Sequence, residues 1–244
     1  MTTSYDCSDP AQRSEGLAHA QRAVAANQCV VIPTDTVYGI AADAFSPQAV
    51  ATLLASKGRG RSMPPPVLIP RVQTMDGLAA EVHPDARKLA EAFWPGGLTL
   101  IFRAQPSLTW DLGDTLGTVA LRVPDDRMAL DLLALTGPLA VSSANRTGSP
   151  AATTGAEAFG QLADSVEVYL EGGPRSATAS TIVDATGGEL ILVRAGSITR
   201  DQLREVVPGL KDPADDAGEA TGPTEADGQP DPDDAGTQHS PVPR

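Results

Sequence analysis

The sequence predicts an α/β fold in which helices cover a sheet. Segments whose apolar residues have helical spacing alternate with short apolar segments from about residue 10 to residue 207, and this alternation is typical of such a fold. Apolar residues also make up 41% of the 244 residues, which is enough to bury a full core. Aromatic residues are only 4%, so we expect a core built from Leu, Val, Ile and Ala.

Three helices are predicted in the first half of the chain, each beginning at a proline. Asp9-Pro10 and Ser46-Pro47 combine a capping residue with a proline suited to the first helical turn, and His83-Pro84 begins the third helix. Apolar residues recur at helical spacing after each start. We expect the second helix to end near residues 56–58 and the third to end at Phe93, before a Trp-Pro-Gly-Gly break.

Short apolar segments predict the strands, and the second half of the chain adds three more helices. Strands are expected at residues 29–32, 67–69, 98–102, 119–123, 139–141, 166–170, 181–183 and 190–193. Helices are expected at residues 125–135, 155–163 and 199–207.

The negative charge of the chain is concentrated after Leu210. The net charge is −13, of which residues 211–244, with nine acids and two bases, carry −7, which leaves −6 for the body. An acidic body argues against general coating of nucleic acid. Residues 211–244 contain ten Gly or Pro and no Leu, Ile, Met, Phe, Tyr or Trp, so we expect a disordered acidic tail. A solvating role is the default, and a charge-based self-inhibitory contact with a basic pocket is the alternative.

The sequence favours a cytoplasmic protein. Its two cysteines, Cys7 and Cys29, form neither a disulfide framework nor a zinc-binding spacing. The first residues lack a basic region followed by an apolar run, so no signal peptide is expected. No apolar stretch approaches the ~20 residues that cross a bilayer.

Common catalytic signatures are missing from the sequence. The three histidines, His19, His83 and His239, are scattered, and there is neither a GxxxxGK[ST] loop nor a GxGxxG after a strand. If the protein is an enzyme, it must work mainly by positioning and charge stabilisation, as phosphoryl and nucleotidyl transfer allow.

The most informative segment follows the strand at residues 29–32. Thr34, Asp35, Thr36 and Tyr38 place polar groups in five residues before Gly39. Sheet edges are where α/β proteins bind ligands, so this segment indicates a site for a small polar ligand.

Cationic side chains occur in two settings. Lys57, Arg59 and Arg61 lie in one loop that three prolines stiffen, and this loop either holds a triphosphate or is a solvated basic turn. Arg122 lies in an otherwise apolar strand, so it must be paired or face a polar cavity. Its partner is either a ligand carboxylate or a side chain such as Asp125 or Asp126. Arg194, at the end of a strand, allows the same alternatives.

Small polar residues follow the predicted strand at 139–141 and precede the predicted strand at 181–183. Ser142, Ser143 and Asn145 can bond a sugar, a phosphate or a carbonyl group, or they cap a turn. Ser180 allows the same alternatives. Asp184 is expected to hold a turn rather than act as a base.

Taken in order, the motifs PTDTVYG, KxR, WPGxLT, RVP, SAN, STIVD and RxG resemble the YrdC-like family of L-threonylcarbamoyladenylate synthases. The resemblance covers roughly residues 14–207. It implies a single twisted mixed-sheet domain at residues 14–210 with a concave, locally basic cavity. Residues 1–13 would be an N-terminal segment with the start of the first helix, and residues 211–244 the tail.

The resemblance also implies a nucleotidyltransferase reaction and a set of site residues. L-threonine, bicarbonate and ATP would give threonylcarbamoyl-AMP and pyrophosphate, and a separate threonylcarbamoyl-transferase complex would use the product to modify adenosine 37 of tRNA. Threonine would contact Thr36, Arg122, Val141 and Ser180. ATP would contact Lys57, Arg59, Met63, Thr118, Ser143, Asn145 and Arg194, with Lys57 and Arg59 as the catalytic cations. Mg²⁺ would arrive with ATP rather than bind a metal site of the protein, and no membrane partner is implied.

The sequence departs from the family pattern at Gly60, Met63 and Leu68, where the family has proline or polar residues. We hypothesise that Arg61 compensates for lost phosphate contacts. The main rival function is binding of double-stranded RNA or nucleotide without catalysis. A paralogue that binds nucleotide without making the product, and a carbamoyl-transfer module of a hydrogenase-maturation enzyme, are further rivals.

Overall fold

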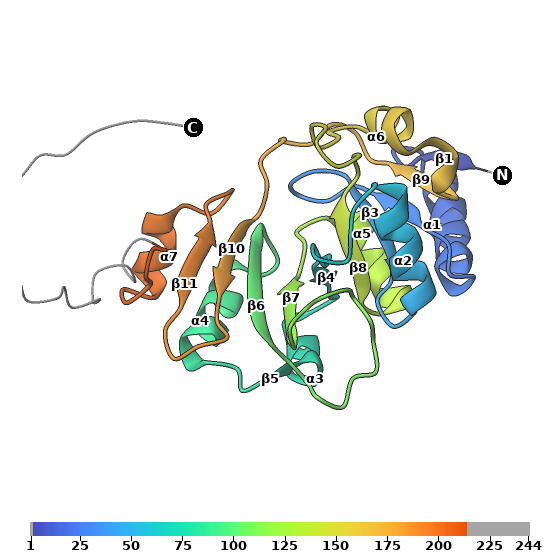
Figure 1. Cartoon of the computed structure of the whole chain (residues 1–244). Helices are drawn as coiled ribbons and strands as arrows, with labels where there is room; N and C mark the ends of the chain where they lie inside the picture. The colour runs from blue at the N-terminus through green and yellow to red at the C-terminus, as the bar shows by residue number, and fades with distance from the viewer. Residues whose placement is uncertain (1, 214–244) are drawn as a thin grey trace, which may run out of the picture.

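The computed structural model describes residues 2–213, and their strands form one mixed sheet (Figure 1). The sheet has the order β1-β9-β2-β3-β8-β4-β7-β6-β10-β11, and β5 pairs with β6 outside this path. The strands are β1 (Thr3–Asp6), β2 (Val30–Ile32), β3 (Gly39–Asp43), β4 (Val67–Leu68), β5 (Ala79–Ala80), β6 (Leu98–Ala104), β7 (Thr118–Arg122), β8 (Leu139–Ser143), β9 (Val168–Glu171), β10 (Thr181–Asp184) and β11 (Ile191–Arg194). Neighbours such as β2 and β3 are antiparallel, whereas β4 and β7 are parallel. The predicted fold class is therefore confirmed.

The predicted helices form, and their caps explain where they begin. The side chain of Asp9 accepts hydrogen bonds from the first turn of α1, and Ser46 does the same for α2. His83 accepts from the backbone N–H of Asp85 at the start of α4. The helices are α1 (Pro10–Ala25), α2 (Pro47–Ser56), α3 (Met75–Leu78), α4 (Pro84–Phe93), α5 (Arg127–Thr136), α6 (Gly155–Leu162) and α7 (Arg200–Val206), with 3₁₀ turns at Val72–Thr74 and Ala163–Ser165.

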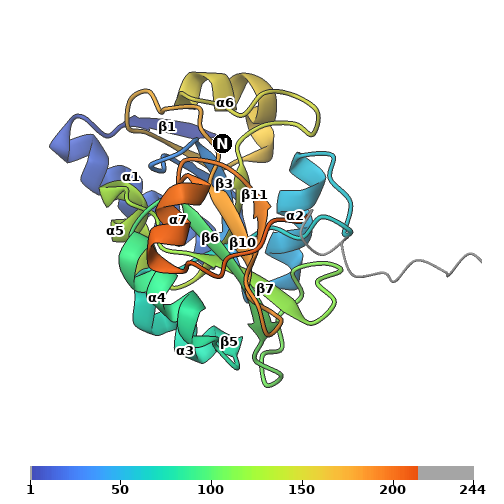
Figure 2. The same ribbon diagram turned by 90° about the vertical axis from the view of Figure 1, so that its left-hand side faces the viewer.

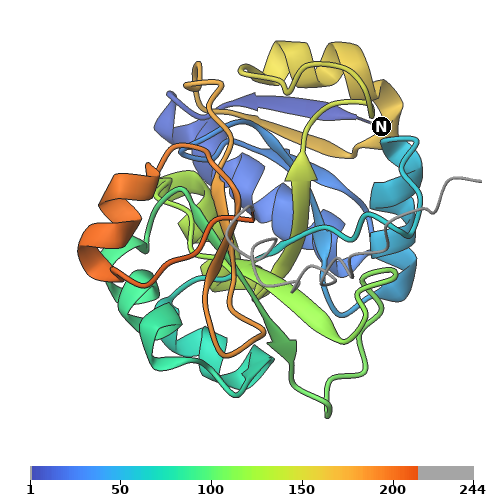
Figure 3. The ribbon, with the colours of Figure 1, turned by 60° about the vertical axis from the view of Figure 1, so that its left-hand side comes forward.

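Helices pack on both faces of the sheet, as the pleat of β2 shows. Val30 and Ile32 belong to the apolar cluster that includes α1 and α5, whereas Val31 belongs to the larger cluster that includes α2. Successive side chains of a strand point to opposite faces. α1 and α5 therefore cover one face and α2 the other. In Figure 2, α4 and α7 lie together near β10, and in Figure 3 the yellow helix α6 lies beside β9.

Three strands were not predicted from the sequence: β1, β3 and the two-residue strand β5, which pairs with β6. β1 lies within residues 1–13, where we expected only a segment before the first helix, and it pairs in parallel with β9. β3 begins at Gly39, directly after the polar segment, and pairs with β2 and β8. The polar residues 33–38 thus connect two antiparallel strands.

The observed bounds also differ at the ends of two predicted segments. β8 continues two residues beyond the predicted 139–141 and includes Ser142 and Ser143. Lys211 pairs with Ile191 of β11, and residues 214–244 of the predicted tail lie outside the described residues. Within residues 2–213, no helix combines the length and the apolar character that crossing a membrane requires.

Candidate active site

A cavity of about 420 Å³ opens over the middle of the sheet and brings together residues from distant parts of the sequence. Its lining includes the turn between β2 and β3, the proline loop after α2, and parts of β6, β7, β8 and β10. Eight of the predicted site residues line it: Thr36, Arg59, Thr118, Arg122, Val141, Ser143, Ser180 and Arg194. Lys57, Met63 and Asn145 are not part of the lining.

The cavity is basic although the protein is acidic. Arg59, Arg122 and Arg194 line it, and no Asp or Glu is among its lining residues. Burial lowers the pKa of each of these three guanidinium groups from its usual value. Cations that have lost part of their hydration bind an anion strongly, so this cavity suits a ligand that carries carboxylate or phosphate groups.

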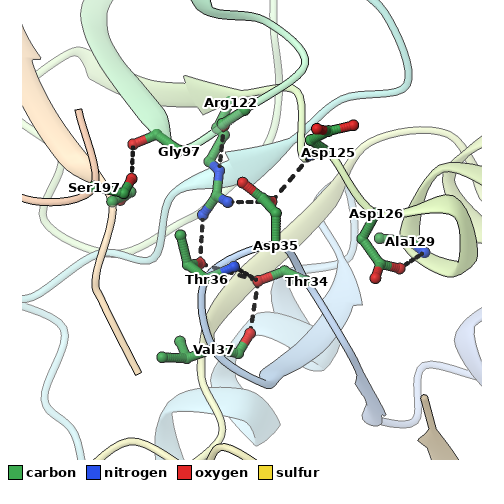
Figure 4. Close-up of polar contacts among 12 residues, drawn as sticks. Thr34, Asp35, Thr36, Val37, Gly97, Arg122, Asp125, Asp126, Ala129 and Ser197 are labelled. Atoms are coloured by element: carbon green, nitrogen blue, oxygen red, sulfur yellow. Dashed lines mark hydrogen bonds and ion pairs between the residues drawn. The ribbon is translucent and has the colours of Figure 1, made fainter. Parts of the chain in front are cut away.

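Arg122 is held by three neighbours at the end of β7 (Figure 4). Its Nε donates to the carbonyl of Gly96 at 2.9 Å, and its Nη1 donates to Thr36 Oγ1 at 3.0 Å. Its Nη2 donates to Asp35 Oδ1 in an ion pair. Burial lowers the pKa of Arg122, and the charge of Asp35 opposes that shift. These contacts use three of the five N–H groups of Arg122, which leaves two for a ligand.

The protein partner of Arg122 is Asp35, not Asp125 or Asp126. Asp126 instead pairs with Arg175 at 2.8 Å and caps α5. Asp125 takes part only through its backbone N–H, which donates to Asp35 Oδ1 at 3.0 Å. The sequence allowed a protein carboxylate or a ligand carboxylate at Arg122, and the structure provides the first while keeping the guanidinium on the cavity wall.

Ser180 and Arg194 form a second polar group on the cavity wall. Arg194 donates from Nη2 to Ser180 Oγ at 3.1 Å and also to the Ser180 carbonyl. Ser180 Oγ lies 3.0 Å from Thr99 Oγ1. The sequence analysis did not single out Thr99, although a polar residue in the apolar strand β6 is the same kind of signal that identified Arg122.

Lys57 is buried behind the cavity rather than on its wall. Its Nζ donates to Asn145 through the backbone carbonyl at 2.6 Å and through Oδ1 at 3.1 Å, and also to the carbonyl of Ser143. Burial, with a smaller effect from the charge of Arg59, lowers the pKa of Lys57 to about 8. All three N–H groups of the ammonium thus have protein acceptors.

The two arginines of the loop after α2 have different surroundings. Arg59 faces the cavity and donates to Ser142 Oγ at 2.9 Å. Arg61 is exposed and pairs with Asp111 at 2.8 Å and with Asp114 at 3.5 Å. Met63 is 39% exposed. Arg61 therefore fastens the 58–66 loop to the 105–117 loop, which brings Leu112 and Thr115 to the cavity wall.

Two glycines allow close backbone approaches around this wall. A Cβ on Gly39 would lie 2.6 Å from Val141 Cγ1, which is too close for β3 and β8 to pair as they do. Gly113 has φ +107°, and a Cβ there would lie 2.6 Å from the carbonyl oxygen of Arg61. Leu112 and Thr115 had no recognisable sequence signal, because they depend on this contact between loops.

Residues 2–213 contain no group of three or more His, Cys, Asp or Glu residues that could hold a metal ion. Both cysteines are free and buried. Burial raises the pKa of Cys7 to about 11 and of Cys29 to about 12, so neither is an activated thiolate.

Comparison with known proteins gives a consistent result. The family model Sua5_yciO_yrdC, described as telomere recombination, matches residues 22–196. A protein of Mycobacterium tuberculosis strain H37Rv is 50% identical over 208 residues, which cover 85% of this chain and 96% of that protein. The threonylcarbamoyl-AMP synthase of Bacillus subtilis is 34% identical over 194 residues, covering 78% of this chain and 56% of the other.

Two solved structures are similar in fold to this protein. Pyrococcus abyssi Sua5 in complex with L-threonine has a TM-score of 0.78 and 29% identity, covering 87% of this chain and 63% of the other. Escherichia coli YciO has a TM-score of 0.71 with 21% identity, over 81% of this chain and 97% of the other, and supports the fold alone.

Proposed function

Because the chain belongs to the Sua5/YciO/YrdC family, we propose that it is a threonylcarbamoyl-AMP synthase. The reaction is L-threonine + bicarbonate + ATP → threonylcarbamoyl-AMP + pyrophosphate + water. The observation that carries the proposal is the basic cavity, whose lining includes three arginines and no carboxylate. A relative named for this activity and a solved Sua5 bound to L-threonine support the choice of substrate.

The amino acid is proposed to bind at the Arg122 side of the cavity. The two unused N–H groups of Arg122 suit the threonine carboxylate, since a guanidinium binds a carboxylate through parallel hydrogen bonds. Thr36 and Ser180 supply hydroxyl groups on the same wall, and Val141 supplies an apolar surface. This arrangement keeps the four threonine-binding residues expected from the sequence.

ATP is proposed to bind with its phosphates near Arg59 and Arg194, and Thr118 and Ser143 line the same cavity. Lys57 and Asn145 were also predicted to contact ATP. In this proposal they do not contact ATP. The Lys57 ammonium instead donates to the carbonyls of Ser143 and Asn145 and so holds Ser143 at the cavity wall. Contact between Met63 and ATP stays a prediction.

The chemistry needs no nucleophile from the protein. The threonine nitrogen attacks the carbon of CO₂, with release of a proton, or of bicarbonate, with release of water, and a carbamate forms. An oxygen of that carbamate attacks the α-phosphorus of ATP, the bond to the β-phosphate oxygen breaks, and pyrophosphate leaves. Charge grows on the leaving phosphates, where Arg59 and Arg194 would stabilise it electrostatically. Holding the reactants in one small cavity supplies the remaining acceleration.

Mg²⁺ is part of this proposal only as the partner of ATP. The cavity lining lacks carboxylates, which are the ligands that Mg²⁺ prefers, and this supports entry of the ion with ATP. Mg²⁺ would therefore enter as the ATP complex. Titration with MgCl₂ alone should give no saturable heat, whereas titration with ATP and Mg²⁺ should.

The product is proposed to serve tRNA modification through a separate threonylcarbamoyl-transferase complex, in the cytoplasm. The decisive experiment measures pyrophosphate release by the purified protein with ATP and Mg²⁺, omitting L-threonine and bicarbonate in turn. Release that needs both, together with the mass of threonylcarbamoyl-AMP, would establish the synthase. Release that is independent of threonine, or absent, would refute it, and salt-dependent binding of duplex RNA would then be measured.

A further inference from the structure

The hydroxyl hydrogen of Thr34 has a fixed direction. Thr34 Oγ1 donates to the backbone carbonyl of Val37 at 2.6 Å (Figure 4). A carbonyl oxygen only accepts, and a threonine hydroxyl has a single hydrogen to donate. Every other contact of Thr34 Oγ1 must therefore be one in which it accepts.

This constraint determines the hydroxyl of Thr36. The two hydroxyl oxygens lie 3.0 Å apart, and since Thr34 has no second hydrogen, Thr36 must be the donor. The backbone N–H of Thr36 also donates to Thr34 Oγ1, at 3.2 Å. Thr34 Oγ1 then has both lone pairs occupied.

Arg122 completes the pattern from the other side. Its Nη1 donates to Thr36 Oγ1 at 3.0 Å, and a guanidinium has no lone pair with which to accept. Thr36 Oγ1 has thus donated its hydrogen to Thr34 and accepted one hydrogen bond. One lone pair is left, and Thr36 lies on the cavity wall.

We propose that Thr34 is a positioning residue that holds the Thr36 hydroxyl as a hydrogen-bond acceptor, so that this wall selects a ligand with an N–H or O–H donor beside its carboxylate. The inference rests on the proposed function, because it takes L-threonine as the ligand. A carboxylate oxygen next to Thr36 would face a lone pair and be repelled, while Arg122 attracts it. The amino acid therefore has one orientation: carboxylate on Arg122, and its amino or hydroxyl group on Thr36.

The test compares Thr34→Val, which keeps the branched shape without the hydroxyl, with Thr34→Ser, which keeps the hydroxyl. Thr52→Val, on the exposed side of α2, is the control for loss of a threonine hydroxyl elsewhere. Loss of one oriented hydrogen bond, worth about 1 kcal/mol, should raise the KM for L-threonine about fivefold in Thr34→Val. The KM for ATP should stay within about twofold in all three variants, and Thr34→Ser should resemble the wild type.

L-2-aminobutyrate, which lacks the threonine hydroxyl, identifies the donor. Equal weakening of L-threonine and L-2-aminobutyrate by Thr34→Val, measured as binding constants by calorimetry, assigns the amino group. Weakening of L-threonine alone assigns the hydroxyl. An unchanged affinity for both ligands, or an equal rise in the KM for threonine and ATP, would overturn the proposal.

The experiment separates this inference from the function on which it rests. Turnover by the wild-type protein tests the synthase, and only a folded Thr34 variant tests the role of Thr34. If Thr34→Val does not fold, as judged by thermal unfolding, Thr34→Cys replaces it, because a thiol of similar size is a weak donor.

Discussion

Lys57 and Asn145, 88 positions apart in the sequence, are joined by two hydrogen bonds from the same ammonium group. The Lys57 Nζ lies 2.6 Å from the Asn145 carbonyl and 3.1 Å from its Oδ1. The Asn145 side chain in turn donates to the carbonyls of Arg146 and Ser149. The buried lysine therefore organises the loop that follows β8, and it affects the cavity through Ser143.

Replacing Lys57 by Met should impair ATP use through this loop. The Asn145 carbonyl loses this donor, and the Ser143 carbonyl keeps only the backbone N–H of Asn145, at 2.9 Å. A buried acceptor without a partner costs about 1–3 kcal/mol, so the loop should rearrange. We expect kcat/KM for ATP to fall at least about tenfold. Lys88→Met is the matched control, since Lys88 is exposed and pairs only with Asp85 among the described residues. Equal activities of the two variants would contradict a role for Lys57.

The lowered pKa of Lys57 predicts a pH dependence of stability. The folded protein releases this proton at about pH 8, against an ordinary value of 10.5. Between these values the unfolded chain binds more protons, so the contribution of Lys57 to the free energy of unfolding rises with pH from about 8 to 10.5, and this gain is lost as pH falls through 8.

Cys7 and Cys29 have the opposite effect, because their raised pKa values lower stability as pH rises above the ordinary value of 9.0. The measurement is therefore the difference in free energy of unfolding between the wild type and Lys57→Met, in urea at several pH values. The free energy of unfolding of the wild type should increase relative to that of the variant between pH 8 and 10. A constant difference would be inconsistent with the assignment.

The ion pair between Asp35 and Arg122 should show strong coupling. Their side chains are 17% and 7% exposed, and removing one partner of a buried pair leaves an uncompensated charge that costs about 3–5 kcal/mol. Asp35→Ala and Arg122→Met should each destabilise the protein by roughly that amount, whereas the double variant should lose much less than their sum. Denaturant unfolding of the four proteins gives the coupling, and additive losses would argue against it.

The sequence predicted local structure better than contacts between distant segments. Helices α1 and α2 begin where Asp9 and Ser46 cap them, because capping depends on neighbouring residues. β1 was missed because the polar segment Thr-Ser-Tyr-Asp is a strand only by pairing with β9, more than 150 residues later. β3 was missed because Gly-Ile-Ala-Ala-Asp has small residues and no alternating pattern.

In the candidate active site, too, the contacts between distant segments could not be predicted from the sequence. The burial of Arg122 in an apolar strand was recognisable, but its pairing with Asp35 depends on where the β2–β3 turn meets the end of β7. The position of Lys57 depends on how the end of α2 packs against the loop after β8. Eight of the eleven predicted site residues line one cavity. The sequence motifs therefore identified most of its predicted residues, but not the contacts that hold them in place.

Thr99→Val should weaken threonine binding through Ser180. Thr99 and Ser180 share one hydrogen bond at 3.0 Å, and Arg194 can only donate to Ser180, so the pair has one hydroxyl hydrogen left for a ligand. Without the Thr99 hydroxyl, the Ser180 hydroxyl loses this partner and is free to rotate, so we expect the KM for L-threonine to rise about fivefold. Thr99→Ser should restore it. Michaelis–Menten kinetics with varied threonine decides, and an unchanged KM in Thr99→Val would exclude this role.

Arg61→Ala should leave ATP affinity unchanged, contrary to the hypothesis that Arg61 replaces lost phosphate contacts. The side chain of Arg61 is 57% exposed, pairs with Asp111 and Asp114, and lies outside the cavity lining. Exposed pairs of this kind contribute little, so the KM for ATP should stay within about twofold of the wild type. Arg59→Ala, measured beside it, should raise the KM at least about tenfold, because Arg59 faces the cavity with a desolvated charge. Similar increases of the KM for ATP in both variants would indicate that Arg61 contacts the ATP phosphates. They would also mean that the 58–66 loop releases Asp111 when ATP binds.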